Sequence, residues 1–130
     1  MKVVLDTNVF IAALRSRQGA SNALLQLLFK KRGFTHCVSV ASVLELEAVL
    51  FRDEHREAYP QFSTEDLRRF VDAVCRVSAH VKLYFRWRPS LRDPDDDLIV
   101  ETALNGGAQA IVTHNTHDFL PVEIQHGLQV

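Results

Sequence analysis

Four aspartates stand within five consecutive positions of Leu91–Val100, a segment that reads LRDPDDDLIV. An acidic start before an apolar run is typical of a helix N-terminus, with Asp93 as the N-cap and Pro94 as the first helical residue. Capping does not account for Asp96, which falls on the stripe that this helix should bury. The other residues of that stripe are Ile99, Val100 and Ala103. A buried carboxylate is costly unless a cation meets it, so Asp96 is a candidate metal ligand.

Asp6 is a second acidic residue placed where it could bind an ion. It directly follows Lys2–Leu5 (KVVL), a short apolar run that predicts a strand buried on both faces. Asp6 could be a turn residue or a helix cap. However, open parallel sheets bind their ligands outside the carboxyl ends of the strands, which is where Asp6 would lie. The residue is therefore a candidate functional group.

Two glutamates, Glu45 and Glu47, interrupt the otherwise apolar stretch SVLELEAVL in a helix predicted from about residue 41 to 57. Each of them shares a helical stripe with apolar residues, so the helical period does not choose between them. Either one could also belong to the solvent-facing side of the helix. The sequence alone therefore leaves the third candidate acid open.

The chain alternates predicted strands and helices, which favours an α/β domain with a mostly parallel sheet and right-handed crossovers. A length of 130 residues, of which 47% are hydrophobic, fits a single globular domain over residues 1–130. Besides the first strand, we expect strands at 34–40, 77–84, 110–112 and 127–130, and helices at 21–31, 41–57 and 93–104. The strands at 77–84 and 127–130 would lie at edges of the sheet.

This topology would bring several polar side chains to one edge of the sheet. The residues at carboxyl ends of strands are Asp6, Ser39 and Thr113. Asp96 and Asp118 could reach the same edge, and Glu45 lies about a turn and a half into the helix after Ser39. Carboxylates that share a crevice repel one another unless a cation is present, and oxygen ligands suit Mg²⁺ or Mn²⁺. Such ions activate water and stabilise the attacking and leaving oxygens of a phosphodiester.

A polyanionic partner would have to be met by a local patch, because the net charge of the chain is −1. Four cations with interleaved aromatic residues form the strongest such cluster, although a solvated edge explains it equally well: Lys82, Arg86, Arg88 and Arg92. The candidates for RNA phosphate contact are Arg15, Arg17, Arg88 and Arg92. Two cysteines far apart in sequence fit reduced thiols in the cytoplasm, and we expect no membrane segment.

With these residues in place, the chain resembles the PIN-domain ribonucleases, and among them the toxin components of toxin–antitoxin systems related to the VapC toxins. The resemblance covers nearly the whole chain. Each matching segment is weak alone, but their order and spacing together are specific. The segments are VVLDTNVFIAAL, SVASVLELEAVL, RDPDDDLIVETAL and IVTHNTHDF.

The resemblance implies a role for each candidate. Asp6 matches the first metal-binding acid of the family, and Asn8 accompanies it in the same turn. The family pattern Glu-Leu-x-x-Val-Leu falls on Glu45–Leu50 and so selects Glu45 between the two glutamates. The family aspartate seven positions before a helical alanine matches Asp96.

The last acidic position of the family falls on Asn115, where many members have aspartate. Asn115 could coordinate an ion through its neutral oxygen, and Asp118 could supply the missing charge. Thr113 and Ser39 match small hydroxyl positions that support the site. The implied catalytic residues are thus Asp6, Glu45, Asp96, Asn115 and Asp118, with the four acids as metal ligands.

For the whole protein, the resemblance implies a three-layer α/β/α sandwich around a central, mainly parallel sheet. It also implies RNA as substrate, Mg²⁺ or Mn²⁺ as cofactor, a homodimer, and an antitoxin protein that blocks the crevice. One rival is a catalytically degenerate PIN-like domain that binds RNA or protein without cutting, which Asn115 supports. A phosphatase of the haloacid dehalogenase type is a weaker rival, because it needs a second aspartate where Asn8 stands.

Overall fold

Parallel strands form the centre of the protein in the computed structural model, which describes residues 1–84 and 94–119. The described sheet has the strand order β3-β2-β1-β4. Its strands are β1 (Lys2–Leu5), β2 (Thr35–Val38), β3 (Ala79–His80) and β4 (Ala110–Val112). All described pairings are parallel, and Leu5 at the end of β1 lies opposite Val112 at the end of β4. The carboxyl ends of these strands therefore meet at one edge of the sheet.

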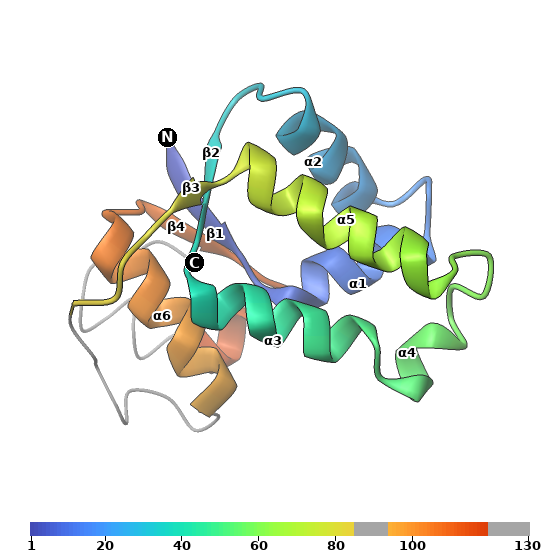
Figure 1. Cartoon of the computed structure of the whole chain (residues 1–130). Helices are drawn as coiled ribbons and strands as arrows, with labels where there is room; N and C mark the ends of the chain where they lie inside the picture. Colours follow the sequence, from blue (N-terminus) through green and yellow to red (C-terminus); the bar gives the residue numbers. More distant parts are fainter. Residues whose placement is uncertain (85–93, 120–130) are drawn as a thin grey trace.

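Helices cover both faces of the sheet, because alternate residues of β1 point to opposite sides. Val3 and Leu5 belong to a core formed with α1 (Thr7–Arg15), α2 (Ala20–Phe29), α3 (Val40–Leu50) and α5 (Thr64–Val77). Val4 belongs to a second core, formed with α6 (Pro94–Gly106) on the opposite face (Figure 1). The predicted three-layer α/β/α sandwich with a parallel central sheet is confirmed.

The helix predicted over residues 41–57 is wrong as one continuous element. It is divided into α3 and the short α4 (Asp53–Arg56), with Arg52 in an extended conformation between them (φ −63°, ψ 135°). The hydroxyl of the buried Tyr59 donates a hydrogen bond of 2.8 Å to the carbonyl of Leu50. A carbonyl at the end of α3 is thereby satisfied where the helix stops. This division turns the chain at Arg52, next to the candidate site.

Other boundaries differ by a few residues. The helix predicted at 21–31 is α2, which begins at Ala20 with Gly19 as its N-cap and ends at Phe29. The edge strand predicted at 77–84 begins only at Ala79, because α5 continues to Val77, and it is two residues long. Pro94 begins α6 as predicted. The strand predicted at 127–130 and the residues Arg86, Arg88 and Arg92 lie outside the described residues.

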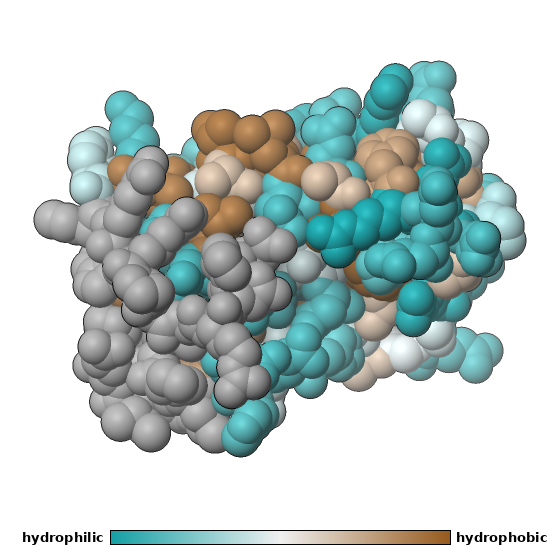
Figure 2. All heavy atoms as spheres, turned by 90° about the horizontal axis from the view of Figure 1, so that it is seen from below, coloured by the Kyte–Doolittle hydropathy of each residue, from teal (hydrophilic) through white to brown (hydrophobic). Residues whose placement is uncertain are grey.

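The face of the molecule shown in Figure 2 carries both hydrophilic and apolar areas. Seen from below, hydrophilic side chains cover much of the half of the molecule where α4 lies, and an apolar patch follows the upper border of this view (Figure 2). Both cysteines are free, and burial raises the pKa of each thiol. Among the described residues, no helix has the length and apolar character needed to span a membrane.

Candidate active site

Asp6 lies at the junction of β1 and α1, and its carboxylate is held from both sides of that junction. Its backbone N–H donates to the carbonyl of Val112 at 2.9 Å, and it is the N-cap of α1. Oδ1 accepts hydrogen bonds from the Thr7 backbone N–H at 2.7 Å and from the Thr7 hydroxyl at 3.3 Å. Oδ2 accepts a 2.8 Å hydrogen bond from the Thr113 hydroxyl, so the orientation of this 5%-exposed residue is fixed.

The hydroxyl of Thr113, just after β4, forms hydrogen bonds with the segment that follows β1. Its Oγ1 donates to Asp6 and accepts hydrogen bonds from the Asn8 side chain at 3.3 Å and from the Asn115 backbone N–H at 3.0 Å. The Oδ1 atom of Asn8 in turn accepts from the backbone N–H of His114 at 3.3 Å. These hydrogen bonds place Asn8 and Asn115 next to Asp6. Asn8 and Thr113 thus lie where supporting residues were predicted.

Ser39, also predicted as a supporting residue, links the two helices that carry the other acids. It is the buried N-cap of α3, where it forms a capping box with Ser42. Its Oγ also lies 2.8 Å from the hydroxyl of Thr102 on α6. Ser39 therefore ties the helix of Glu45 to the helix of Asp96, without lining the pocket described below.

Replacing Ser39 by alanine should cost more stability than removing a comparable exposed cap. We expect Ser39→Ala to lower the free energy of unfolding by about 2 kcal/mol. The buried N–H of Ser42 loses its acceptor, and the hydrogen bond between Ser39 and Thr102 is lost. Ser63→Ala, which removes the exposed capping box of α5, should cost about 1 kcal/mol. Urea unfolding of both variants measures the difference. Equal losses would show that the link between α3 and α6 adds nothing.

Three carboxylates from distant parts of the sequence line one polar pocket of about 210 Å³. They come from the end of β1, from α3 and from the first turns of α6. The described residues that line the pocket are Asp6, Thr7, Asn8, Glu45, Val49, Arg52, His55, Asp96 and Asn115. The structure thus brings together four of the predicted catalytic residues, namely Asp6, Glu45, Asp96 and Asn115.

The structure distinguishes the two glutamates between which the helical period could not choose, because they line different pockets. Glu45 is largely buried, with a side chain 19% exposed, and its Oε1 lies 3.9 Å from Nη2 of Arg52 in the pocket. Glu47 is exposed and lines a different pocket with Phe51 and Arg68. The position of Glu45 agrees with the choice made by resemblance, and its role stays a prediction.

Other predicted residues are not brought into the pocket. Asp118, within the described part of the chain, is exposed on a helical turn at 116–119 and does not line the pocket. Arg15 and Arg17 are exposed at and beyond the C-terminal end of α1, about 13 Å along the helix from its N-cap. The roles of these three residues stay predictions.

Sequence reasoning missed three polar residues that line the pocket, Thr7, Arg52 and His55, and the apolar Val49. For Arg52 the helical period gives no valid signal, because α3 ends at Leu50 and Arg52 is in an extended conformation after it. His55 gave no signal either, since its position depends on the break between α3 and α4. Sequence reasoning also missed the burial of Asp97 and Glu101, which are 2% and 1% exposed on α6.

The donor atoms of the pocket are of the kind that a hard divalent ion prefers, although they are not close enough together to form a preorganised metal site. Three carboxylates and two side-chain amides supply oxygen atoms, which Mg²⁺ and Mn²⁺ prefer. Within residues 1–84 and 94–119, no three His, Cys, Asp or Glu side chains are arranged to hold a metal ion. Glu45, which is turned toward Arg52, is long enough to change its position by side-chain rotation. The chemistry of the donor set, and not a preformed geometry, is therefore what fits the ion.

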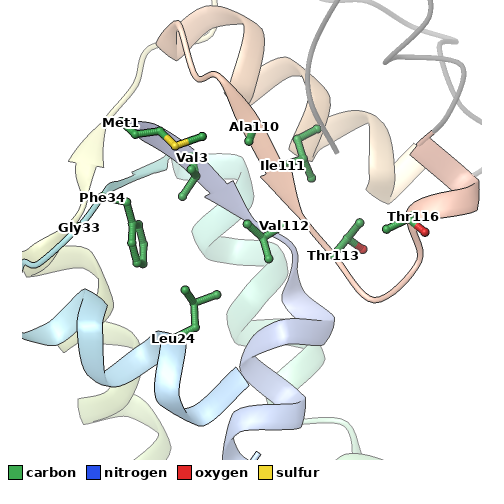
Figure 3. Close-up of a pocket in the computed structure, with 10 residues that line it drawn as sticks. All are labelled: Met1, Val3, Leu24, Gly33, Phe34, Ala110, Ile111, Val112, Thr113 and Thr116. Carbon is green, nitrogen blue, oxygen red and sulfur yellow. The ribbon is translucent and has the colours of Figure 1, made fainter. Parts of the chain in front are cut away.

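A larger pocket, of about 460 Å³, lies beside the β1–β4 pair and has a different character (Figure 3). Leu24 of α2, Phe34 and Val3 line it with the residues of β4, and Figure 3 shows their apolar side chains around the opening. Among the described residues that line it, none has a charged side chain, and its polar side chains are Thr113 and Thr116. The groups able to do hydrolytic chemistry are in the smaller pocket.

Comparison with known proteins places the chain in a family. No curated protein matched the chain. Among solved structures, it is similar to a chain in the crystal structure of VapBC2 from Rickettsia felis bound to a DNA fragment from their promoter, with a TM-score of 0.59 and 20% identity over 92% of each chain. At this identity the similarity shows the fold alone. The family model of the PIN domain matches residues 2–117, nearly the whole sequence, and the chain therefore belongs to the PIN domain family.

Proposed function

We propose that this protein is a metal-dependent ribonuclease that hydrolyses phosphodiester bonds of RNA. The observation that carries the proposal is the convergence of Asp6, Glu45 and Asp96, from three separate elements, on one polar pocket. Membership of the PIN domain family supports it. A pocket with this concentration of acidic side chains suits the binding of a cation and, through it, of a phosphate group.

The residues of the pocket take distinct roles in this proposal. Asp6, Glu45 and Asp96 would hold Mg²⁺ or Mn²⁺, and Asn115 would add a neutral oxygen in place of a fourth acid. The bound ion would supply an activated water and would stabilise the attacking and leaving oxygens of the phosphodiester. Thr113 keeps Asp6 in one orientation by donating to Oδ2, while the Thr7 N–H donates to Oδ1. Asp6 thus presents fixed oxygen lone pairs to the pocket.

The proposal extends to the biological role of the protein. Because the sequence resembles VapC-related toxins and the fold is similar to a chain of the VapBC2 structure, we propose a toxin component that acts in the cytoplasm. Its partners would be RNA, a cognate antitoxin protein that covers the pocket, and a second copy in a homodimer. Arg15 and Arg17, together with Arg88 and Arg92, would contact RNA phosphates beyond the pocket.

Metal removal tests the proposed activity directly. A fluorescently labelled RNA should be cleaved in the presence of Mg²⁺ or Mn²⁺, and excess EDTA should abolish cleavage because the carboxylates cannot by themselves activate water. Adding Mn²⁺ beyond the EDTA concentration should restore cleavage. Gel analysis of the RNA fragments measures the outcome, and undiminished cleavage in EDTA would contradict the proposal.

A second candidate is a PIN domain that binds RNA without cutting it. The presence of Asn115 in the pocket favours this candidate, because an amide brings no negative charge to a second ion. The same assay separates the two functions. RNA that shifts in a binding experiment but remains intact with Mg²⁺ and with Mn²⁺ would indicate the non-cleaving domain.

A further inference from the structure

We propose that Arg52 and His55, at the junction of α3 and α4, form a wall of the carboxylate pocket that binds the phosphate of the substrate. This inference rests on the proposed nuclease function and adds to it the side chains that contact the phosphodiester itself. Both residues line the same pocket as the three acids. The pocket therefore combines groups suited to a cation with groups suited to an anion.

Arg52 is positioned by the break between the two helices. It occupies the N-cap of α4 in an extended conformation, and its side chain returns to α3 near Glu45. The distance of 3.9 Å between Nη2 and Oε1 of Glu45 is longer than that of a charge-assisted hydrogen bond, which is about 2.8 Å. The Arg52 side chain is also half-exposed, at 49%. Arg52 thus keeps N–H donors that could form short hydrogen bonds with phosphate oxygens.

His55 supplies a second polar group with unused hydrogen-bonding capacity. Its Nδ1 atom is buried and has no hydrogen-bond partner among the described residues. Its Nε2 atom faces Glu54 Oε1 at 3.9 Å, outside hydrogen-bond distance. A buried polar atom without a partner destabilises the fold, and such atoms often have a functional explanation. Nδ1 is closed off from solvent, so Nε2 is the ring nitrogen that a ligand in the pocket could contact. In the tautomer that carries the proton on Nε2, this atom could donate to a phosphate oxygen of bound RNA.

The placement of Arg52 leads to effects of opposite sign on two ligands. A positive charge beside Glu45 opposes the binding of a divalent cation at the carboxylates and favours the binding of an anion. Removal of this charge should therefore strengthen binding of the metal and weaken binding of RNA. If Arg52 served only to hold the α3–α4 junction together, its loss would weaken the binding of both ligands.

The test compares Arg52→Gln with a matched control, Arg69→Gln. Arg69 also pairs with a glutamate, Glu65, at 3.0 Å, but on the exposed surface of α5. Mn²⁺ binding is measured by isothermal titration calorimetry, and binding of labelled RNA by fluorescence anisotropy in EDTA, where no metal-dependent cleavage occurs. For Arg52→Gln we expect RNA affinity to fall about tenfold and Mn²⁺ affinity to rise about threefold or more. Arg69→Gln should change neither by more than about twofold.

His55→Phe provides an independent measurement of the same wall. It keeps a ring of similar size but removes both nitrogens. The melting temperature should rise because the unpaired buried Nδ1 is gone, while RNA affinity should fall because Nε2 can no longer donate. The proposal is overturned if Arg52→Gln lowers the affinity for both Mn²⁺ and RNA, or leaves RNA affinity within twofold of the original protein. An unchanged RNA affinity in His55→Phe would remove His55 from the wall.

These binding measurements do not depend on turnover. Failure of the original protein to cleave RNA with Mg²⁺ or Mn²⁺ would refute the proposed nuclease function while leaving the affinity changes measurable. Conversely, suppose that the original protein cleaves RNA normally while Arg52→Gln shows no loss of RNA affinity. This result would support the nuclease function and refute the phosphate-binding wall.

Discussion

Asp6→Asn and Asp96→Asn are each expected to lower the rate of metal-dependent RNA cleavage by about 100-fold or more. Each change removes a negative charge from the pocket where the ion would bind, and an ion contributes several kcal/mol to stabilising the transition state. Asparagine keeps an oxygen at position 6 that can accept from the Thr7 N–H, and it is as good an N-cap as aspartate. The fold should therefore survive, which circular dichroism can verify, while rates are measured with a labelled RNA.

Glu45 and Glu47 offer a matched pair for the same experiment. Both lie on α3 two positions apart, but only Glu45 lines the pocket with Asp6. Glu45→Gln should lose most of the cleavage activity, whereas Glu47→Gln should retain it within about threefold. Wild-type rates in Asp6→Asn or Glu45→Gln, purified in parallel, would refute the assignment of the pocket.

The stability of the protein should fall steeply in mild acid because of His36. This residue lies on β2 and is 2% exposed. The centroid of its ring lies 5.6 Å from the centroid of the Phe10 ring. Burial lowers the pKa of His36 from 6.5 to about 4, and a hydrogen bond with the backbone of Leu5 opposes this shift only in part. The folded protein therefore keeps the ring neutral at a pH where the unfolded chain has already protonated it.

The sign of the effect follows from this difference in proton binding. Below about pH 6.5 the unfolded chain binds a proton that the folded protein does not, so the free energy of unfolding decreases as the pH falls. The decrease continues to about pH 4, where the folded protein also protonates. Over the whole interval, His36 should contribute a loss of roughly 3 kcal/mol.

Variants isolate the contribution of His36 from that of other titrating groups. Urea unfolding at several pH values should show a shallower pH dependence for His36→Gln than for the original protein. His80→Gln serves as control, because His80 is exposed at the edge of the sheet on β3. Identical pH dependence in His36→Gln and the original protein would show that burial of this ring does not govern acid stability.

Much of the fold was predictable because local signals agreed with the final packing. The apolar run of β1, the positions of Ser39 and Thr113 after strands, and Pro94 at the start of α6 are all read from neighbouring residues. The break at Arg52 was not predictable in this way. It depends on the Tyr59 hydroxyl, which reaches the end of α3 only when the chain is folded.

The same distinction applies to the site. The placement of Asp6 and Asp96 followed from a strand end and a helix start, which single segments reveal. The choice of Glu45 over Glu47 depends on which side of α3 faces the pocket, and that is decided by the packing of α3 against other helices. Residues such as His55 enter the pocket only through tertiary structure, and periodicity does not reveal them.

The hydrogen bond from Thr113 to Asp6 spans 107 positions of the sequence, and it has a consequence for how the protein is made. While the chain emerges from the ribosome, Asp6 appears long before its strand partner Val112 and the Thr113 hydroxyl, because about a hundred residues lie between them. A site assembled from residues this far apart in the sequence stays incomplete until Thr113 has been synthesised. If the protein cleaves RNA as proposed, the RNA of the ribosome that makes it is not exposed to a complete site before that point.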